Sequence, residues 1–209
     1  MSHYVAEHIP GARLVLVPGN GLNIYYKPYA QILDHIESFV TGTSPSSDTN
    51  RALATILFTD IVDSTGQAAS LGDRRWGGLL ESHDALAKSI VDQHGGRLVK
   101  LTGDGLLATF DGPGRAIRCA LAFRDALVPL RLTIRAGLHT GEVELRDEDI
   151  GGIAVHIAAR VLEQAGPSEL LTSSAVPLLV AGSGIEFEDR GEHELKGIAG
   201  TSRLYAVES

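Results

Sequence analysis

The feature that most constrains the fold is the order in which helix-like and strand-like patterns of apolar residues follow one another in the later part of the chain. Apolar residues that recur every three to four positions predict helices, and short β-rich apolar runs between turn residues predict strands. Gly95-Gly96 ends the first helical pattern, and Asp104-Gly105 lies in an expected hairpin turn. In chain order, the sequence predicts a strand at 53–61, a helix at 64–94, strands at 97–101 and 106–110, a helix at 115–127, and strand patterning around a glycine-containing turn at 132–145.

This order is strand, helix, strand, strand, helix, strand. It predicts an α+β fold with a ferredoxin-like core, in which an antiparallel sheet carries helices on one face. The remaining sequence adds a helix from about Ile153 to Gln164 and a strand at 169–173. A short helix and closing strands near 185–190 and 203–207 complete the expected C-terminal additions.

The beginning of the chain has a different organisation. Residues 43–50, TSPSSDTN, lack apolar periodicity and have the composition of a linker. Before them, residues 12–19 indicate a buried strand with a Pro-Gly turn, and residues 29–42 indicate an amphipathic helix. One strand and one helix bury little core. We therefore predict a small segment at 1–42, a linker at 43–50 and a domain at 51–209.

Composition and charge exclude several classes of function. The net charge of -8 opposes binding to a nucleic acid, and lysine and arginine nowhere form a basic track. The single cysteine, Cys119, excludes an intrachain disulfide and cysteine-based zinc sites, and it fits a reducing compartment. The sequence shows neither a secretory leader nor a run of about 18 apolar residues. We expect a cytoplasmic protein without direct membrane insertion, and a membrane-tethered parent protein stays open.

Two aspartates could share one metal site. Asp60 ends the first expected strand, and Asp104 lies in the hairpin turn. Neighbouring strands of such a sheet end close together, and one or two carboxylates are the usual protein ligands of Mg²⁺ that also binds substrate phosphates. Taken singly, however, ordinary turn chemistry explains each aspartate better.

Four motifs in sequence favour the metal site. In order and spacing they resemble the catalytic domain of class III nucleotidyl cyclases over residues 52–208, and in particular the adenylyl type. The resemblance implies an enzyme that converts ATP to 3′,5′-cyclic AMP and pyrophosphate at sites shared by two chains of a homodimer. The motifs are FTDIVDST at 58–65, VKLTGDG at 99–105, RAGLHTGEV at 135–143 and DIGGIAVHIAARV at 149–161.

The resemblance also implies the metals and the phosphate site. In the family, the aspartates that match Asp60 and Asp104 bind two Mg²⁺ or Mn²⁺ ions per active site, together with the carbonyl that matches Ile61. One ion activates the ribose 3′-hydroxyl for in-line attack on the α-phosphate, and the other neutralises the departing pyrophosphate. Residues Val62, Asp63, Ser64 and Thr65 precede a helix whose free N–H groups suit the β- and γ-phosphates, although Asp63 is better explained as the cap of that helix.

Lys100 and Asp149 match the purine-reading positions of the family. Adenine presents an acceptor at N1 and a donor at its 6-amino group, so a lysine beside an aspartate complements it. Guanine inverts this order, and the guanylyl type has glutamate and cysteine at these positions. ATP is therefore the expected substrate. Viewed singly, Lys100 is better explained as a solvated strand residue and Asp149 as an acidic loop residue.

The last motif carries the proposed catalytic charge. Arg160 matches the arginine that stabilises the transition state in the family, and His156 lies one helical turn earlier, where most of the family has a ribose-orienting asparagine. His156 either replaces that asparagine or only packs. Lys196 matches a phosphate-contacting lysine, but a surface Lys-Gly turn explains it nearly as well. Turn and packing roles are expected for Gly137, His139 and Gly141.

Two alternatives stay open at this level. A catalytically weak cyclase-homology domain could act as a regulatory nucleotide-binding or dimerisation module, and a guanylyl cyclase is disfavoured only by the Lys100 and Asp149 pair. Residues 1–42 resemble the C-terminal end of an α/β-hydrolase. Where that family places its catalytic histidine this sequence has Gly21-Leu22-Asn23, and it has no G-x-S-x-G motif, so we expect a remnant without hydrolase activity.

Overall fold

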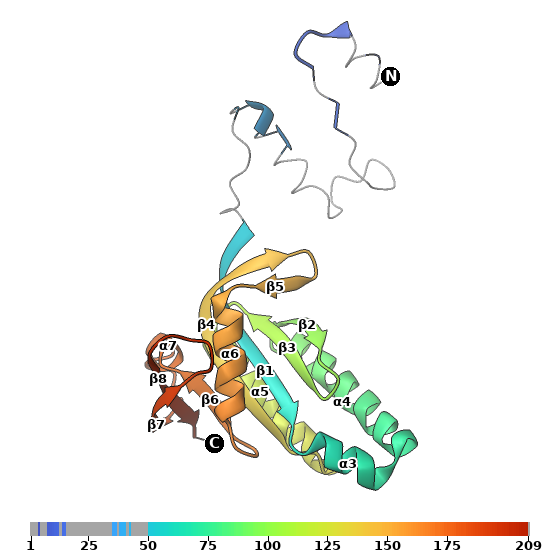
Figure 1. The fold of residues 1–209 in the computed structure, drawn as a ribbon, viewed down its shortest axis with the longest axis vertical. Coiled ribbons are helices and arrows are strands. Elements are labelled where there is room, and N and C mark those ends of the chain that lie inside the picture. Colours follow the sequence, from blue (N-terminus) through green and yellow to red (C-terminus); the bar gives the residue numbers. More distant parts are fainter. Residues whose placement is uncertain are drawn as a thin grey trace. The chain divides into compact units, whose positions relative to one another are not determined.

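The computed structural model describes residues 4, 8–12, 14–15, 35–36, 38–40, 42 and 50–208. The chain divides into two compact units, Met1–Thr49 and Asn50–Ser209 (Figure 1). Much of the expected strand at 12–19 and nearly all of the expected linker at 43–50 lie outside the described residues, so the proposed organisation of the first unit stays a prediction. The fold described below is that of the second unit.

The second unit has most of the elements that the sequence predicts, and in addition a short strand at 149–151, a 3₁₀ helix at 128–130 and a division of the first helix in two. In chain order the elements are β1 (Arg51–Ile61), α3 (Ser64–Leu71), α4 (Asp73–Gln93), β2 (Arg97–Leu101), β3 (Gly105–Phe110), α5 (Pro113–Leu127), the 3₁₀ helix η2 (Val128–Leu130), β4 (Ile134–Arg146), β5 (Asp149–Gly151), α6 (Ile153–Gln164), β6 (Leu170–Ser173), α7 (Ala175–Leu179), β7 (Phe187–Glu194) and β8 (Thr201–Val207).

These strands form one sheet in the order β2-β3-β1-β4-β6-β8-β7, with β5 paired to β4. Every pair is antiparallel except β4 with β6. The four strands β2, β3, β1 and β4 have the predicted ferredoxin-like arrangement. The prediction of an α+β fold with this core and C-terminal additions is therefore confirmed.

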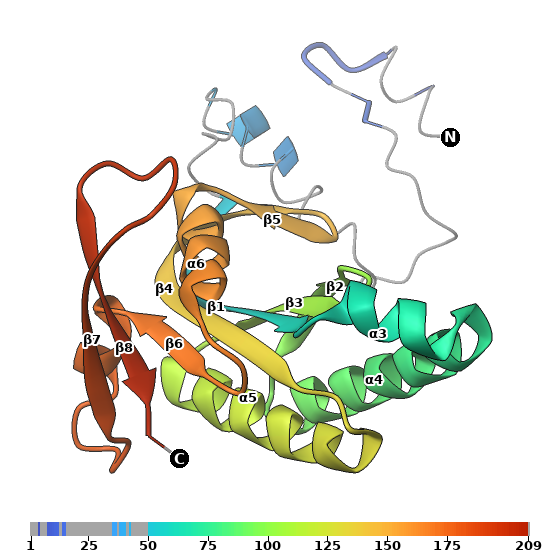
Figure 2. The same cartoon turned by 60° about the horizontal axis from the view of Figure 1, so that its bottom comes forward.

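Both sheet faces are covered, because the strands alternate between two apolar clusters. In β1, Leu57 packs in the cluster formed with α4 and α5, whereas its neighbour Ile56 packs in the cluster formed with Ala154 and Ala158 of α6. Figure 2 shows α4 and α5 on one side of the sheet and α6 on the other. The core helices thus share one face, as predicted, and the added helix α6 covers the opposite face.

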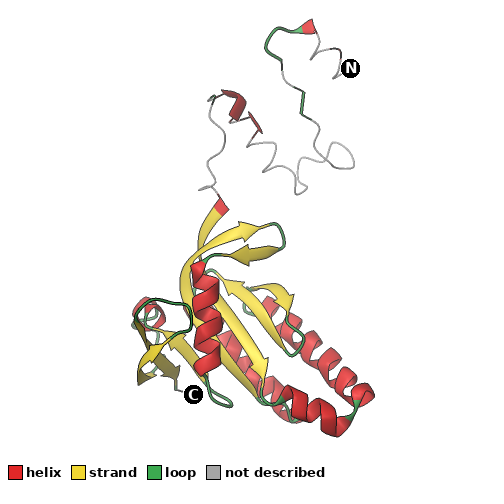
Figure 3. Cartoon of the chain, viewed as in Figure 1, coloured by secondary structure: helices red, strands yellow, loops and turns green. Residues whose placement is uncertain are grey.

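Two local predictions are wrong. The single helix expected at 64–94 is interrupted at Gly72, whose φ of 78° ends α3 before α4 begins (Figure 3). The turn expected within 132–145 does not exist, because β4 runs through Gly137 and Gly141. A Cβ on Gly137 would lie 2.3 Å from the backbone nitrogen of Leu162. This glycine therefore lets α6 lie directly on β4 rather than forming a turn.

Among the described residues, we find no helix with the length and apolar character that crossing a bilayer requires.

Candidate active site

The two candidate metal ligands lie at the same end of neighbouring strands. Asp60 is paired with Gly105 of β3, and Asp104 directly precedes that glycine. The amide of Ile61 donates to the backbone carbonyl of Asp104 at 2.9 Å. A Cβ on Gly105 would lie 1.9 Å from the carbonyl oxygen of Thr59, so only glycine permits this approach of the hairpin to β1.

Each of these carboxylates has a partner within the chain. Asp104 Oδ2 accepts a hydrogen bond from Ser64 Oγ at 2.5 Å. Asp60 Oδ2 accepts from Arg135 Nε at 3.1 Å and from Arg135 Nη2 at 2.7 Å, in a pair that is only partly exposed. Our sequence analysis missed Arg135. It lies directly opposite Asp60 in the β1–β4 register, which the linear spacing of the motifs does not reveal.

The donor set at this edge suits a hard divalent cation. Two carboxylates, the Ile61 carbonyl and the Ser64 hydroxyl offer only oxygen, which Mg²⁺ and Mn²⁺ prefer. In the described part of the chain no three His, Cys, Asp or Glu side chains gather as a complete metal cage. The residues therefore fit a cation that takes its other ligands from phosphate oxygens and water.

The segment between β1 and α3 is held in an unusual backbone conformation. The amide of Val62 donates to the carbonyl of Thr133 at 2.8 Å, and Asp63 has a φ of 53°. Asp63 occupies the N-cap position, as expected, but its carboxylate makes no capping hydrogen bond. It lies instead over Gly66, where a Cβ would be 2.5 Å from Oδ1. The start of α3, at Ser64 and Thr65, is thus left without a side-chain cap.

Lys100 and Asp149 are brought together although 49 positions separate them. Lys100 Nζ donates to Asp149 Oδ2 at 2.7 Å, and Asp149 Oδ1 accepts from the amide of Ile150 at 2.9 Å. The two side chains are 48% and 50% exposed. The hydrogen bond from Lys100 is the largest of the effects that lower the pKa of the Asp149 carboxyl. A fixed donor thus lies beside a fixed acceptor at the surface.

The outer face of α6 carries the candidate catalytic side chains. Its inner face buries Ala154, Ala158 and Val161, so His156 is exposed. Packing in the interior therefore does not explain this histidine. Arg160 Nε donates to the backbone carbonyl of Lys196 at 3.0 Å, and its Nη1 pairs with Glu163.

Comparison with known proteins gives the family. Residues 48–209 match the adenylate and guanylate cyclase catalytic domain. The chain belongs to this family. A putative adenylate cyclase 3 of Rhizobium meliloti (strain 1021) is 32% identical to this cyclase domain over 133 residues, which are 59% of the chain and 22% of that protein. The chain spans between 16% and 61% of the length of the first curated relatives that it matches.

Solved structures of cyclases share the fold. The adenylyl cyclase CyaB from P. aeruginosa superposes with a TM-score of 0.71 at 24% identity, over 76% of this chain and 95% of that one. An adenylate/guanylate cyclase/hydrolase from Silicibacter pomeroyi superposes with a TM-score of 0.64 at 29% identity, over 76% of this chain and 98% of that one. The match to this fold and family supports nucleotide cyclase activity, and cyclases of this class use divalent metals.

The site residues of the cyclase domain fall into two groups. Within the part of the chain that the structure describes, no hydrogen bond or ion pair joins Asp60 or Asp104 to Lys100, Asp149 or Arg160. One group is the aspartate edge at β1 and β3. The other consists of the pair formed by Lys100 and Asp149 and the outer face of α6.

His139 of the cyclase domain has the packing role that we expected. Its Nδ1 is hydrogen bonded to Ser173 Oγ at 2.6 Å, which links β4 to β6. Burial lowers the pKa of His139. A Cβ on Gly141 would lie 2.9 Å from His139 Nε2, so this glycine leaves room for the ring.

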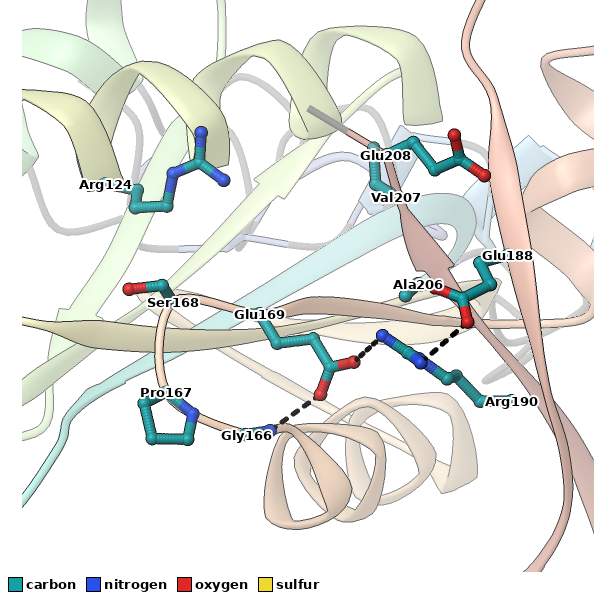
Figure 4. A pocket seen from close by; sticks show the side chains of 10 residues that line it. All are labelled: Arg124, Gly166, Pro167, Ser168, Glu169, Glu188, Arg190, Ala206, Val207 and Glu208. Carbon is teal, nitrogen blue, oxygen red and sulfur yellow. Dashed lines mark hydrogen bonds and ion pairs between the residues drawn. The ribbon is translucent and has the colours of Figure 1, made fainter.

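A separate concave surface of about 750 Å³ lies between α5, the loop before β6, and strands β7 and β8. Figure 4 shows Arg190 between Glu169 and Glu188, at 2.9 Å from each. Glu169 also accepts from the amide of Gly166 at 2.8 Å. Several of its polar groups thus bind one another, and none of the candidate site residues lines this concavity.

Proposed function

We propose that this cyclase domain is an adenylyl cyclase that converts ATP to 3′,5′-cyclic AMP and pyrophosphate. The observation that carries the proposal is the pair formed by Lys100 and Asp149, in which an ammonium donor lies 2.7 Å from a carboxylate acceptor at a half-exposed surface. Adenine offers the matching acceptor and donor at N1 and the 6-amino group. Guanine would leave these groups mispaired at a cost of about 1–3 kcal/mol each.

The aspartate edge supplies the metal ligands in this proposal. Asp60 and Asp104, with the Ile61 carbonyl, would hold two Mg²⁺ or Mn²⁺ ions. Bound there, the ions supply activation of the 3′-hydroxyl and neutralisation of the triphosphate. Ser64 orients the Asp104 carboxylate through its 2.5 Å hydrogen bond.

The uncapped start of α3 supports a phosphate site at Val62, Asp63, Ser64 and Thr65. Free N–H groups and the positive end of the helix dipole favour the β- and γ-phosphates there. The Asp63 carboxylate opposes these phosphates electrostatically, and a bound cation would offset that repulsion.

The outer face of α6 supplies transition-state stabilisation. The hydrogen bond from Arg160 Nε to the Lys196 carbonyl limits the orientations of the guanidinium, which preorganises it for the charge that grows at the α-phosphate. Lys196 would contact the phosphates. His156 is exposed one turn away, where a ring nitrogen could orient the ribose.

The two groups make no hydrogen bond or ion pair to each other in the described part of the chain, which supports active sites shared between two chains. In each site, one chain would provide Asp60 and Asp104, and the other would provide Lys100, Asp149 and Arg160. Two-fold symmetry then generates two equivalent sites in a homodimer, and a monomer has none. We further propose that the domain acts in the cytoplasm, a location that its single cysteine supports.

We also propose that residues 1–42 are a hydrolase-like remnant. The strand pattern with its Pro-Gly turn at 12–19 and the amphipathic pattern at 29–42 support this proposal. Residues 43–50 would link the remnant to the catalytic domain.

One assay separates the proposal from its alternatives. The purified chain is incubated with Mn²⁺ and either ATP or GTP, and the cyclic products are quantified. Cyclic AMP as the main product supports the proposal, and cyclic GMP as the main product refutes the assignment of the base. No product from either nucleotide would favour a regulatory homology domain. Asp60→Ala and Asp104→Ala serve as controls that should remain folded and dimeric but inactive, because they remove metal ligands and release only the partly exposed Arg135 and Ser64.

A further inference from the structure

We propose that Arg97 is a positioning residue that helps to set nucleotide specificity by holding the β4–β5 hairpin, residues 144–151, against strand β2. The hairpin carries Asp149, so the role in specificity rests on the proposed function. The anchoring itself is a property of the fold and can be measured without any nucleotide. No part of the sequence resemblance assigns a role to Arg97.

The hydrogen bonds between β4 and β5 are too few to hold the hairpin in place by themselves. β5 has three residues and pairs only with the end of β4, at Glu144, Leu145 and Arg146. A two-stranded hairpin of this length is at best marginally stable in water. Its turn also contains Asp147 at a φ of 36°, which residues other than glycine rarely adopt. The position of Asp149 therefore depends on other contacts.

Arg146 braces the hairpin internally. It lies directly opposite Asp149, and its Nη2 donates to Glu144 at 2.8 Å. A Cβ on Gly151 would lie 2.8 Å from the guanidinium carbon of Arg146, so the guanidinium lies flat over the backbone there. These contacts stiffen the hairpin, but they do not connect it to the sheet beyond β4.

Strand β1 makes part of that connection, because Arg51 pairs with Glu144 and Nδ2 of the preceding Asn50 donates to the Leu145 carbonyl. Three side chains of β2 provide the rest. Arg97 Nη2 donates to the backbone carbonyl of Asp147 at 3.3 Å, and Lys100 Nζ donates to Asp149 at 2.7 Å. Between them, Val99 packs against the apolar cluster that contains Ile150. The hairpin is thus held at its turn, along its apolar side and at Asp149.

A β-bulge makes this arrangement possible. Side chains of a regular strand alternate between faces, so Arg97 and Lys100 would point to opposite sides. The β2–β3 register shifts between Leu98 and Lys100, which inserts one extra residue. Bulges re-aim side chains in this way. Arg97, Val99 and Lys100 can therefore all reach the same hairpin.

Of the two polar β2 side chains that contact the hairpin, Lys100 is itself proposed to bind the base, and Arg97 is not. When the nucleotide binds, Lys100 and Asp149 would each form a hydrogen bond to the base, which weakens the bond between them. The bond from Arg97 to the Asp147 carbonyl involves neither Lys100 nor Asp149 and would persist. It would keep Asp149 at the correct distance from Lys100 while both contact the base.

Loss of this anchor should affect binding more than chemistry. In Arg97→Ala, Asp149 would be correctly placed for a smaller fraction of the time. We expect KM for ATP to rise about two- to tenfold, the range of one intramolecular hydrogen bond, and the preference for ATP over GTP to fall by a similar factor. The value of kcat should change by less than about twofold, because Asp60 and Asp104 lie on other strands.

The experiment compares Arg97→Ala with two matched variants. Arg97→Lys keeps a long cationic donor and should restore at least half of the lost specificity. Asp147→Asn keeps the carbonyl that accepts the bond and should behave as wild type. Steady-state kinetics give KM and kcat for ATP and GTP, and amide hydrogen exchange of the nucleotide-free protein reports on residues 144–151. Exchange should accelerate in that segment of Arg97→Ala and not elsewhere.

A double-mutant cycle tests whether Arg97 affects KM through Asp149. In an Asp149→Ala background, Arg97→Ala should raise KM for ATP no further, because the residue that it positions is absent. Additive effects would overturn the positioning role.

The remaining outcomes separate this inference from the proposed function. Unchanged exchange at 144–151 in Arg97→Ala would overturn the anchoring, whether or not the protein is a cyclase. Faster exchange with unchanged KM and unchanged nucleotide preference would overturn the role in specificity. A wild-type protein that makes no cyclic nucleotide would refute the proposed function and the specificity role together, while the exchange data would still decide the anchoring.

Discussion

Replacement of Arg135 by glutamine should tighten the binding of a divalent metal to the nucleotide-free protein. Arg135 makes two hydrogen bonds to Asp60, at 3.1 and 2.7 Å. A metal ion that shares the carboxylate therefore meets a fixed positive charge nearby. Glutamine removes the charge and keeps much of the side-chain length.

The magnitude follows from the geometry and the exposure of the pair. Two unit charges about 4 Å apart interact by about 4 kcal/mol at the effective dielectric constant found near protein surfaces. The Arg135 side chain is 34% exposed and that of Asp60 is 24% exposed, so solvent screens part of this energy. We expect about 1–2 kcal/mol of relieved repulsion, which is about five- to thirtyfold tighter binding of Mn²⁺.

The assay is a Mn²⁺ titration of nucleotide-free protein, followed by calorimetry or by the paramagnetic signal of free Mn²⁺. Arg118→Gln is the matched control, because Arg118 is an exposed arginine of α5 without an ion pair to Asp60. Asp60→Asn should weaken binding strongly. The difference between Arg135→Gln and wild type should shrink at high salt. Equal or weaker Mn²⁺ binding by a folded Arg135→Gln protein would refute the electrostatic reasoning.

Three further predictions concern the shared site, the base and the buried thiol. If Asp60→Ala and Arg160→Ala proteins exchange subunits freely, each mixed dimer holds one intact site, so about a quarter of the wild-type activity should return. A mixture that stays inactive despite subunit exchange, shown with labelled chains, contradicts the shared site. Lys100→Glu combined with Asp149→Cys should weaken the use of ATP and admit GTP, and an unchanged preference for ATP would place base recognition elsewhere. Burial raises the pKa of Cys119 to about 12, so at pH 8 only about one thiol in ten thousand is ionised, and native protein should resist thiol reagents that label the unfolded chain at once.

Local sequence signals were sufficient for the order of elements and for the placement of several site residues. The Asp-Gly turn predicted the hairpin that carries Asp104, and the apolar run before Asp60 predicted where β1 ends. The spacing of four residues predicted that His156 and Arg160 share a face of α6, and both lie outside its buried stripe. These features depend on contacts between residues close in sequence.

Features that depend on distant segments were not predicted. The ion pair between Asp60 and Arg135 requires the β1–β4 register, which joins residues 75 positions apart. Gly137 suggested a turn, whereas its actual role is the approach of α6 to β4. The bulge before Lys100 has no marker in the sequence, because neither glycine nor proline occurs between Arg97 and Leu101. The direction of the Arg97 side chain was therefore invisible until β2 and the hairpin were placed together.

The close approach of α6 to β4 has a mechanical consequence. At Gly137 the backbone of Leu162 lies so close to β4 that no side chain fits between them, so the helix and the strand are packed together at this point. β4 carries Arg135 near one end and leads into the hairpin with Asp149 at the other, while α6 carries Arg160. Arg135 and Arg160 should therefore move together as one rigid unit, and Asp149 should follow them as far as its hairpin is held. Any opening or closing of a shared site would then displace α6 and β4 together rather than one past the other.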